Sequence, residues 1–533
     1  MKTELGTIEG AVVRRLDELE AARVTRRIWA KDPTVWKNDP STPEIRDRLG
    51  WLTVAETMLD QVPALARFAD EVRAGYDRIV LCGMGGSSLA PEVLQRTFGA
   101  APGYPTLVVL DSTDPRAVAA AVPPPLPPAD LTRTLFLVSS KSGTTLESDC
   151  FFRYCWERGG GGGQGRHFVA ITDPDTPLAR LAREHGFRRA FLNPPDIGGR
   201  FSALSYFGLV PAALLGLDVT RLLHRAQAQA TLCGPDTTPR DSPGARLGAL
   251  LGDAALAGRD KLTFLLSPGI ESFGTWAEQL VAESTGKEGM GILPVVGEPL
   301  GEPAVYGRDR LFVALTLAGE DDAAVAGRLA ALERAGHPVA RLSLADRYDL
   351  GQEFFRWEFA TAIAGAILRI NPFDQPNVAE SKANTTAVLE RRAAPSPPAD
   401  QRELRQFFAE IPAGAYLALM AYLPPLPEYD RRLQAIRVAL RDRLRVATTL
   451  GYGPRLLHST GQLHKGGPAI GHFLQITEAA SSQDVAIPGK PFTFGVLEAA
   501  QAEGDLRALR ARGRPALRVE GLELLERATA SAV

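Results

Sequence analysis

The chain carries, at residues 81–92, the stretch LCGMGGSSLAPE, in which three glycines and two serines separate an apolar run from an expected helix. The run before it, Arg78–Cys82, is typical of a buried strand. After it, Pro91 lies near the expected helix start, where the missing N–H of proline costs nothing. Free backbone N–H groups at a strand–loop–helix junction bind anions, so this glycine loop predicts a phosphate site.

Two other interpretations of the glycine loop stay open at this point. Glycine can merely supply the positive φ of a tight strand–helix turn. A dinucleotide fingerprint would combine such a loop with Asp111 at the end of the next apolar run, but its sixth position here is Ser88 instead of glycine. Two adjacent hydroxyls suit a small phosphate group better than the flank of a pyrophosphate.

The length and composition are typical of a soluble protein with several domains. The 533 residues are 45% hydrophobic and 23% charged, with a formal net charge of −2. We expect no nucleic-acid partner, because no basic excess can neutralise a phosphate polymer. We expect no membrane span, because no apolar run nears about 20 residues. The charged N-terminus does not resemble a signal peptide, and the four cysteines lack metal spacing, so we expect a cytoplasmic protein.

Short apolar runs alternate with helical stretches along the chain, which predicts an α/β fold of parallel sheets joined by crossover helices. The expected strands are Arg78–Cys82, Thr106–Leu110, Leu135–Ser139, Phe168–Thr172, Leu262–Ser267, Leu311–Leu317, Val339–Leu344, Tyr416–Tyr422, His472–Thr477 and Ala516–Glu520. The expected organisation is a helical N-terminal segment (1–50), a first α/β domain (51–220), a second (221–390), a linker (391–400) and a C-terminal α/β region (401–533).

A second hydroxyl-rich loop follows the expected strand Leu135–Ser139. Residues 140–148, SKSGTTLES, place five hydroxyl residues around one glycine and one lysine and lead into a helix. A helix N-cap needs only one hydroxyl, whereas hydroxyls and N–H groups at a helix N-terminus can all donate to phosphate oxygens. Because ligands bind outside the carboxyl ends of parallel strands, we expect this loop and the glycine loop to converge on one phosphate.

Other segments suit acid–base chemistry. Gln279 and Glu283 are four positions apart on an expected helix that ends at Gly286, so they share a face. A carboxylate there can act as a general base, and Arg200, after a glycine pair, can stabilise negative charge on a substrate oxygen. On spacing alone these can equally be solvated or ion-paired side chains. Histidine moves protons near neutral pH, and two histidines lie in the loop HSTGQLHKGG at residues 458–467.

Together these motifs resemble the phosphoglucose isomerase family. Its motifs match in order at Gly83 to Ser87, Ser140 to Thr145, Gly199 to Ser202, Gln279 to Lys287, and Asn371 to Lys382. The resemblance implies two tandem sugar-isomerase (SIS) domains with the substrate between them. The region beyond residue 400 is similar to the isomerase half of bifunctional transaldolase/phosphoglucose isomerase proteins. We expect no transaldolase activity, because no room for that barrel exists before Leu81.

The resemblance also implies a reaction and its residues. Glucose 6-phosphate and fructose 6-phosphate would interconvert through a cis-enediolate, with Glu283 moving the proton and Arg200 stabilising the intermediate. Gln279 would orient the substrate, and Lys382 would assist ring opening. The residues expected to bind the sugar phosphate are Gly86, Ser87, Ser140, Lys141, Ser142 and Thr145. The resemblance implies no metal and no cofactor, and it implies a homodimer.

One departure and three alternatives accompany the resemblance. The family's G-Q-H loop between the glutamate and the final lysine is missing, and only His337 lies in that interval. We predict that His464, or failing that His458, supplies the ring-opening acid. A dual phosphoglucose/phosphomannose isomerase would use the same base. A non-catalytic SIS-type sugar-phosphate sensor would not need Glu283 or Arg200, and an aminosugar synthase would need an N-terminal cysteine.

Overall fold

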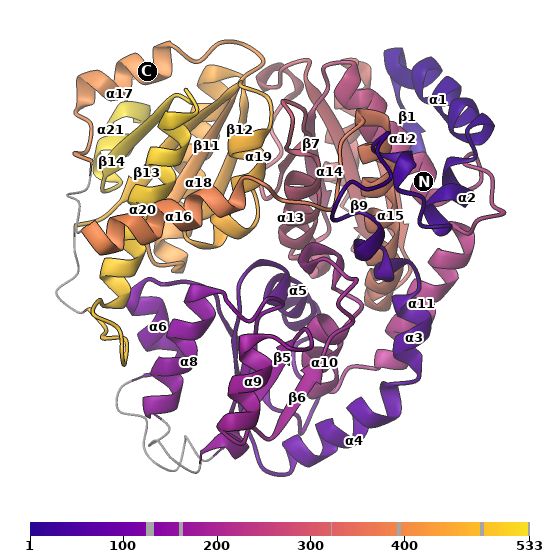
Figure 1. Cartoon of the computed structure of the whole chain (residues 1–533). Helices are drawn as coiled ribbons and strands as arrows, with labels where there is room; N and C mark the ends of the chain where they lie inside the picture. Colours follow the sequence, from indigo (N-terminus) through magenta and orange to yellow (C-terminus); the bar gives the residue numbers. More distant parts are fainter. Residues whose placement is uncertain (124–132, 159–163, 321, 392–395, 480–483, 531–533) are drawn as a thin grey trace.

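The described residues of the computed structural model form three β-sheets with helices packed between and around them (Figure 1). The structure describes residues 1–123, 133–158, 164–320, 322–391, 396–479 and 484–530. Part of the predicted linker, residues 392–395, lies outside this set. Within the described ranges, no helix combines the length and the apolar composition that crossing a bilayer requires.

The first sheet is parallel throughout, in the order β3-β2-β4-β5-β6. Its strands are β2 (Arg78–Cys82), β3 (Thr106–Leu110), β4 (Thr134–Ser139), β5 (Phe168–Thr172) and β6 (Arg189–Leu192). Successive residues of β2 are buried, as expected of a strand that is covered by helices on both faces. The helices of this part are α3 (Val54–Leu59), α4 (Val62–Arg73), α5 (Leu89–Phe98), α6 (Pro115–Ala121), α8 (Leu146–Arg158), α9 (Pro177–Glu184) and α10 (Tyr206–Leu214).

The second sheet has the order β1-β10-β9-β7-β8, and only β1 is antiparallel to its neighbour among these described strands. Its strands are β1 (Lys2–Glu4), β7 (Lys261–Leu266), β8 (Leu293–Val295), β9 (Arg310–Leu317) and β10 (Val339–Leu344). Its helices are α1 (Glu9–Ala21), α2 (Val24–Trp29), α11 (Val219–Leu232), α12 (Pro243–Leu256), α13 (Phe273–Thr285), α14 (Ala323–Arg334) and α15 (Leu350–Leu368). Helix α15 is buried along most of its length, and one continuous apolar core joins it to the first sheet.

The third sheet is parallel, in the order β12-β11-β13-β14. Its strands are β11 (Tyr416–Tyr422), β12 (Ala447–Tyr452), β13 (Gly471–Thr477) and β14 (Ala516–Glu520). Its helices are α16 (Val378–Arg391), α17 (Gln401–Ala409), α18 (Pro427–Leu444), α19 (Gly461–Gly466), α20 (Phe494–Ala511) and α21 (Glu523–Ala530). One face of β11 shares an apolar cluster with Ala282 of α13 and Leu293 of β8, so the third sheet is packed directly against the second.

The predicted α/β class with parallel sheets is confirmed, and each predicted strand is present within one residue of its expected bounds. Strands β1, β6, β8 and β12 were not predicted. The first three are short, and β6 is mostly exposed while β8 contains Pro294, so neither shows the apolar run of a buried strand. Their pairing depends on neighbours that are distant in sequence.

Candidate active site

The glycine loop after β2 brings three distant segments into contact. It forms a short helix, η5 (Gly85–Ser87), at the carboxyl end of the sheet. A Cβ atom on Gly86 would lie 2.1 Å from the carbonyl oxygen of Gly199, and one on Gly85 would lie 2.9 Å from that of His458. Gly85 also has a φ of +54°. The glycines therefore serve both the turn and the close approach of neighbouring backbone.

The hydroxyl of the second serine in this loop is bonded inside the protein, which does not favour two adjacent hydroxyls that both bind phosphate. Ser88 is fully buried, and its hydroxyl donates to the carbonyl of Gly85 and to Asp111 Oδ2, each at 3.2 Å. Asp111 Oδ2 also lies 3.4 Å from Arg455 Nε. Asp111 thus holds internal contacts, and the ribose-binding role of a dinucleotide fingerprint finds no support.

The hydroxyl-rich loop lies beside the glycine loop, because β4 and β2 are adjacent parallel strands. Ser140 Oγ lies 2.9 Å from Thr145 Oγ1 and accepts a hydrogen bond from the Gly143 N–H, whereas Ser142 is exposed. The loop leads into the N-terminus of α8, whose N–H groups favour an anion. Lys141 is ion-paired with Asp173, and its ammonium group also donates to the carbonyl of Pro195.

Gln279 and Glu283 share a helix face as their spacing predicts, and Arg200 lies beside them. Glu283 is 8% exposed, and its Oε2 accepts a hydrogen bond of 3.1 Å from Gln279 Nε2. The other carboxylate oxygen lies 3.5 Å from Arg200 Nη1. Gln279 Nε2 also donates to the carbonyl of His458 at 2.7 Å. The helix ends at Gly286, where a Cβ atom would lie 2.3 Å from Leu463 Cα, so the third sheet region packs on this helix end.

The guanidinium of Arg200 is held on all sides. Its Nε donates to Ser284 Oγ at 2.8 Å, its Nη1 to Gln375 Oε1 at 2.9 Å, and its Nη2 to the carbonyls of Pro372 and Asp374 at 2.7 and 2.9 Å. Burial lowers the pKa of Arg200, although arginine stays charged at neutral pH. This arginine is therefore a fixed positive charge beside the Glu283 carboxylate.

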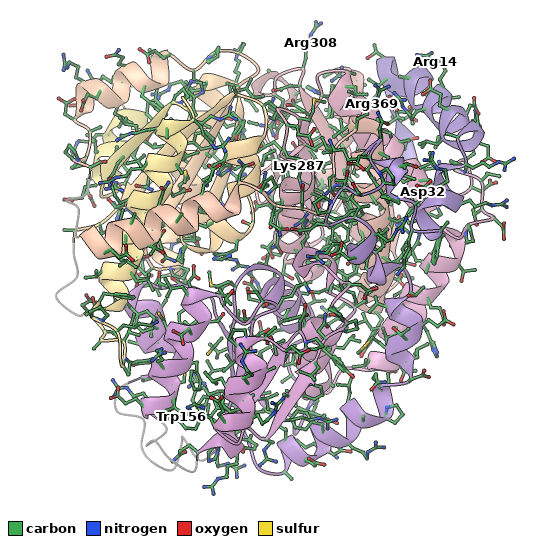
Figure 2. All side chains as sticks on the ribbon, in the orientation of Figure 1. Arg14, Asp32, Trp156, Lys287, Arg308 and Arg369 are labelled. Carbon is green, nitrogen blue, oxygen red and sulfur yellow. The ribbon has the colours of Figure 1, made fainter. Side chains whose placement is uncertain are left out.

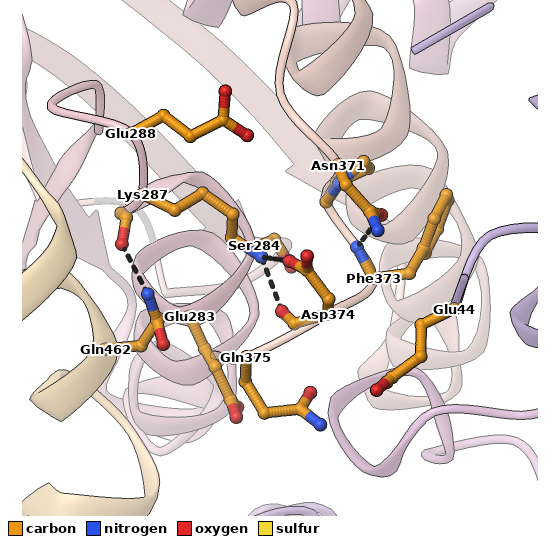
Figure 3. Close-up of polar contacts among 12 residues, drawn as sticks. Glu44, Glu283, Ser284, Lys287, Glu288, Asn371, Phe373, Asp374, Gln375 and Gln462 are labelled. Carbon is orange, nitrogen blue, oxygen red and sulfur yellow. Dashed lines mark hydrogen bonds and ion pairs between the residues drawn. The ribbon is translucent and has the colours of Figure 1, made fainter. Parts of the chain in front are cut away.

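A second buried cation lies one turn beyond Ser284. Lys287 is at the junction of the second and third sheets (Figure 2), and its Nζ donates to Asp374 Oδ1 at 2.7 Å. Burial lowers the pKa of Lys287 to about 8. In Figure 3 Lys287 turns toward Asp374, whereas Glu283 and Gln375 end side by side. Lys287 thus secures the loop that carries the partners of Arg200.

The structure separates the two candidate histidines. His464 is buried, and neither of its ring nitrogens has a hydrogen-bond partner among the described residues. Its ring packs near Tyr416 and Phe473, and burial lowers its pKa to about 3. His458 instead lies against the glycine loop, with Nε2 3.0 Å from Glu147 Oε1. His458 thus contacts the glycine loop that carries Gly86 and Ser87, whereas His464 lies on α19, which packs against the end of α13.

Two acidic partners of the histidine segment were missed by sequence reasoning. Glu147, in the first turn of α8, binds His458 and also accepts a 2.7 Å hydrogen bond from Gln501 Nε2. Arg455, in the short helix η11 (Arg455–His458), pairs with Glu92. Glu147 stands in the quoted stretch SKSGTTLES, so its place after a phosphate loop was a usable signal. No sequence signal pointed to Arg455 or Gln501.

The structure places His337 apart from this site, and the role expected of Lys382 in ring opening stays a prediction. His337 packs against Phe312 and Tyr306, which belong to an apolar cluster that contains none of the predicted site residues. Lys382 falls on α16, but its side chain lies outside the described part of the structure. The site as described therefore consists of the two loops of the first sheet, the end of α13, Arg200 and the His458 segment.

Comparison with known proteins shows which family this chain is related to. No protein-family model matches the chain. A probable glucose-6-phosphate isomerase of Haloarcula marismortui is 31% identical over 381 residues, which are 64% of this chain and 83% of that protein. A glucose-6-phosphate isomerase of Lactobacillus delbrueckii subsp. bulgaricus is 29% identical over 396 residues, covering 65% and 87%.

Solved structures agree on the fold. The hypothetical protein TT0462 from Thermus thermophilus superposes with a TM-score of 0.62 and 25% identity over 74% of this chain and all of its own length (100%). A glucose-6-phosphate isomerase from Chlamydia trachomatis has a TM-score of 0.58 at 21% identity, covering 74% and 89%, and shows the fold alone. On the sequence relationship, this chain belongs to the glucose-6-phosphate isomerase family.

Proposed function

We propose that the protein interconverts glucose 6-phosphate and fructose 6-phosphate, with Glu283 as the base that carries the proton between C1 and C2. The observation that carries this proposal is the position of Glu283, a nearly buried carboxylate between the amide of Gln279 and the guanidinium of Arg200. Transfer between adjacent carbons needs one group that accepts a proton and returns it, and a single carboxylate can do both.

Arg200 suits the stabilisation of a cis-enediolate. Removing a proton next to a carbonyl places negative charge on oxygen, and a preorganised cation lowers the energy of that state without moving. The contacts of Arg200 with Ser284, Gln375 and two backbone carbonyls fix its guanidinium before the substrate arrives. Gln279, held by Glu283 and by the His458 carbonyl, would orient the sugar.

Ring opening falls to His458 in this proposal, in place of His464. Opening the cyclic sugar requires a proton on the ring oxygen and removal of one from the anomeric hydroxyl, and imidazole is suited to both. Glu147 can hold the orientation of the ring through the 3.0 Å contact with Nε2. His464 is buried and neither of its ring nitrogens has a polar partner among the described residues, so nothing there would orient it for proton transfer.

The phosphate would bind where the two loops of the first sheet meet. Ser140, Ser142 and Thr145 would supply hydroxyls, while Gly86 and Ser87 would supply backbone N–H groups of the glycine loop. The N-terminus of α8 favours the anion at this place. Lys141 would contribute only through the local positive potential, because its ammonium is paired with Asp173. Phosphate binding of this kind would hold the reacting carbons in position beside Glu283.

The test is a coupled assay that follows glucose 6-phosphate formed from fructose 6-phosphate. Glu283→Gln should lower kcat by about 10²–10⁴-fold, the usual contribution of general acid–base catalysis. Glu288→Gln is the matched control, since Glu288 is exposed, pairs with Lys37 and lies away from Glu283 in Figure 3. A Glu283→Gln protein that turns over as fast as wild type would rule out this base.

The same experiment separates the alternatives. A sugar-phosphate sensor would bind fructose 6-phosphate without any turnover in the wild-type protein, which calorimetry beside the assay would reveal. A dual isomerase would also convert mannose 6-phosphate, and its activity would fall equally in the Glu283→Gln variant because both substrates would use one base. The buried Arg200–Glu283 pair favours an enzyme over a sensor, because binding alone does not require a base.

A further inference from the structure

A cavity of about 390 Å³ lies at the carboxyl edge of the third sheet, away from Glu283. Tyr422, Thr477 and Glu520 mark the ends of β11, β13 and β14 on one side, and the start of α6 closes the other. Ligands of parallel sheets bind at this edge, and the volume is in the range of small-molecule sites. Its described lining residues include none of those assigned to the sugar phosphate.

Polar atoms in the cavity wall lack partners. Within the described ranges, Tyr422 Oη, Glu498 Oε1 and Arg518 Nη2 are buried and make no hydrogen bond. Tyr422 is only 4% exposed and Arg518 only 5%. Buried polar atoms are nearly always satisfied in native proteins, so several unsatisfied ones in one cavity indicate a ligand that completes them. Burial raises the pKa of Glu498 well above its usual value, and the nearby Asp114 adds to this shift while Arg116 opposes it.

The charges of the lining select the kind of ligand. Its carboxylates outnumber its guanidiniums five to two, the acids being Asp114, Glu478, Asp484, Glu498 and Glu520. Both arginines are already paired: Arg116 with Asp114 and Glu478 at 2.8 and 2.9 Å, and Arg518 with Glu503 at 3.0 Å. The negative field disfavours phosphates and carboxylates and favours a cation.

We propose that this cavity is a second ligand site of the protein, which binds a small organic amine. The ammonium group pairs with Glu498 Oε1, and the Tyr422 hydroxyl and Arg518 Nη2 satisfy another polar atom of the ligand. The carbon body packs on the apolar part of the wall, which includes Val496, Ala499 and Ala502. Because a sugar phosphate is an anion, the site discriminates against the substrate proposed for the Glu283 cleft.

The test uses three probes with one phenyl body and different charge: 2-phenylethylammonium, 2-phenylethanol and phenylacetate. Calorimetry on the full chain should show the ammonium binding at least about tenfold tighter than the alcohol, and no binding of phenylacetate. Saturating fructose 6-phosphate should not displace the ammonium. Glu498→Gln should weaken its binding by about tenfold or more, and Ala499→Phe, which fills the cavity, should abolish it.

The controls separate loss of binding from loss of structure. Glu428→Gln removes the same charge from an exposed position of α18 in the same region and should leave ammonium binding unchanged. Glu498 Oε1 is buried and makes no hydrogen bond within the described ranges, so the Glu498→Gln protein should not melt at a lower temperature than the wild type. The proposal is overturned if the ammonium fails to bind at millimolar concentration, if the alcohol binds equally well, or if folded Glu498→Gln binds it like wild type.

Discussion

Gly86→Ala is expected to disable the enzyme through a contact between two backbones. The added Cβ atom would lie 2.1 Å from the carbonyl oxygen and 2.3 Å from the carbonyl carbon of Gly199, and 3.0 Å from the amide nitrogen of Arg200. Ordinary van der Waals contact requires the two backbones to separate by about 1 Å or more. No flexible side chain is available to absorb this shift, because the atoms in conflict are main-chain atoms.

The expected loss of activity depends on how far this shift displaces Arg200. Ser202 donates hydrogen bonds to the carbonyls of both Gly86 and Gly199. If the Gly86 loop and the Gly199 loop separate, these hydrogen bonds are lost. Overpacking of this kind costs about 1–3 kcal/mol of stability. A displacement of about 1 Å in a catalytic group costs roughly 10²-fold in rate. We therefore expect kcat/KM for fructose 6-phosphate to fall about 10²-fold with a modestly lower melting temperature.

The neighbouring Gly198→Ala variant is the matched control. A Cβ on Gly198 would have Phe201 Cδ2 at 3.7 Å as its nearest neighbour, an ordinary contact, and its backbone is extended with φ −65°. Coupled-assay kinetics and thermal melts of both variants decide the question. Wild-type kcat/KM in a folded Gly86→Ala protein would refute the reasoning, as would an equal loss in Gly198→Ala.

Three further perturbations test the site. His458→Asn should lower kcat/KM on cyclic glucose 6-phosphate about tenfold or more, whereas His464→Asn should change it by less than about twofold; the opposite ranking would return the ring-opening role to His464. Arg200→Lys should lower kcat by about 10²–10³-fold in the coupled assay, because one ammonium cannot replace the fork that binds Ser284 and Gln375; a wild-type kcat would contradict this. His464 has a folded-state pKa of about 3 against an ordinary value of 6.5. Between pH 3 and pH 6.5 the unfolded state therefore binds a proton that the folded state does not bind. The free energy of unfolding consequently falls as the pH drops below 6.5. At pH 5 this costs about 2 kcal/mol, and urea titrations should show that His464→Phe removes that part of the acid sensitivity.

The sequence by itself determined ten of the fourteen strands of the described structure and the local geometry around Glu283. Runs such as Arg78–Cys82 predict buried strands because local hydrophobic pattern and β-propensity agree there. The four-residue spacing of Gln279 and Glu283 predicts a shared helix face, and the structure joins them by a hydrogen bond. These features depend on residues that are neighbours in the chain, which is the information that a sequence pattern carries.

Only the tertiary structure decided which distant side chains meet. It pairs β1 with β10, brings the His458 carbonyl to Gln279, and places Glu147 against a histidine 311 positions away. It also bonds Ser88 to Asp111 and pairs Lys141 with Asp173, although Ser88 and Lys141 lie in loops whose composition suits phosphate binding. The physical reason is that the partners of a side chain are fixed by how three sheets pack together, and residue type and local spacing leave that packing undetermined.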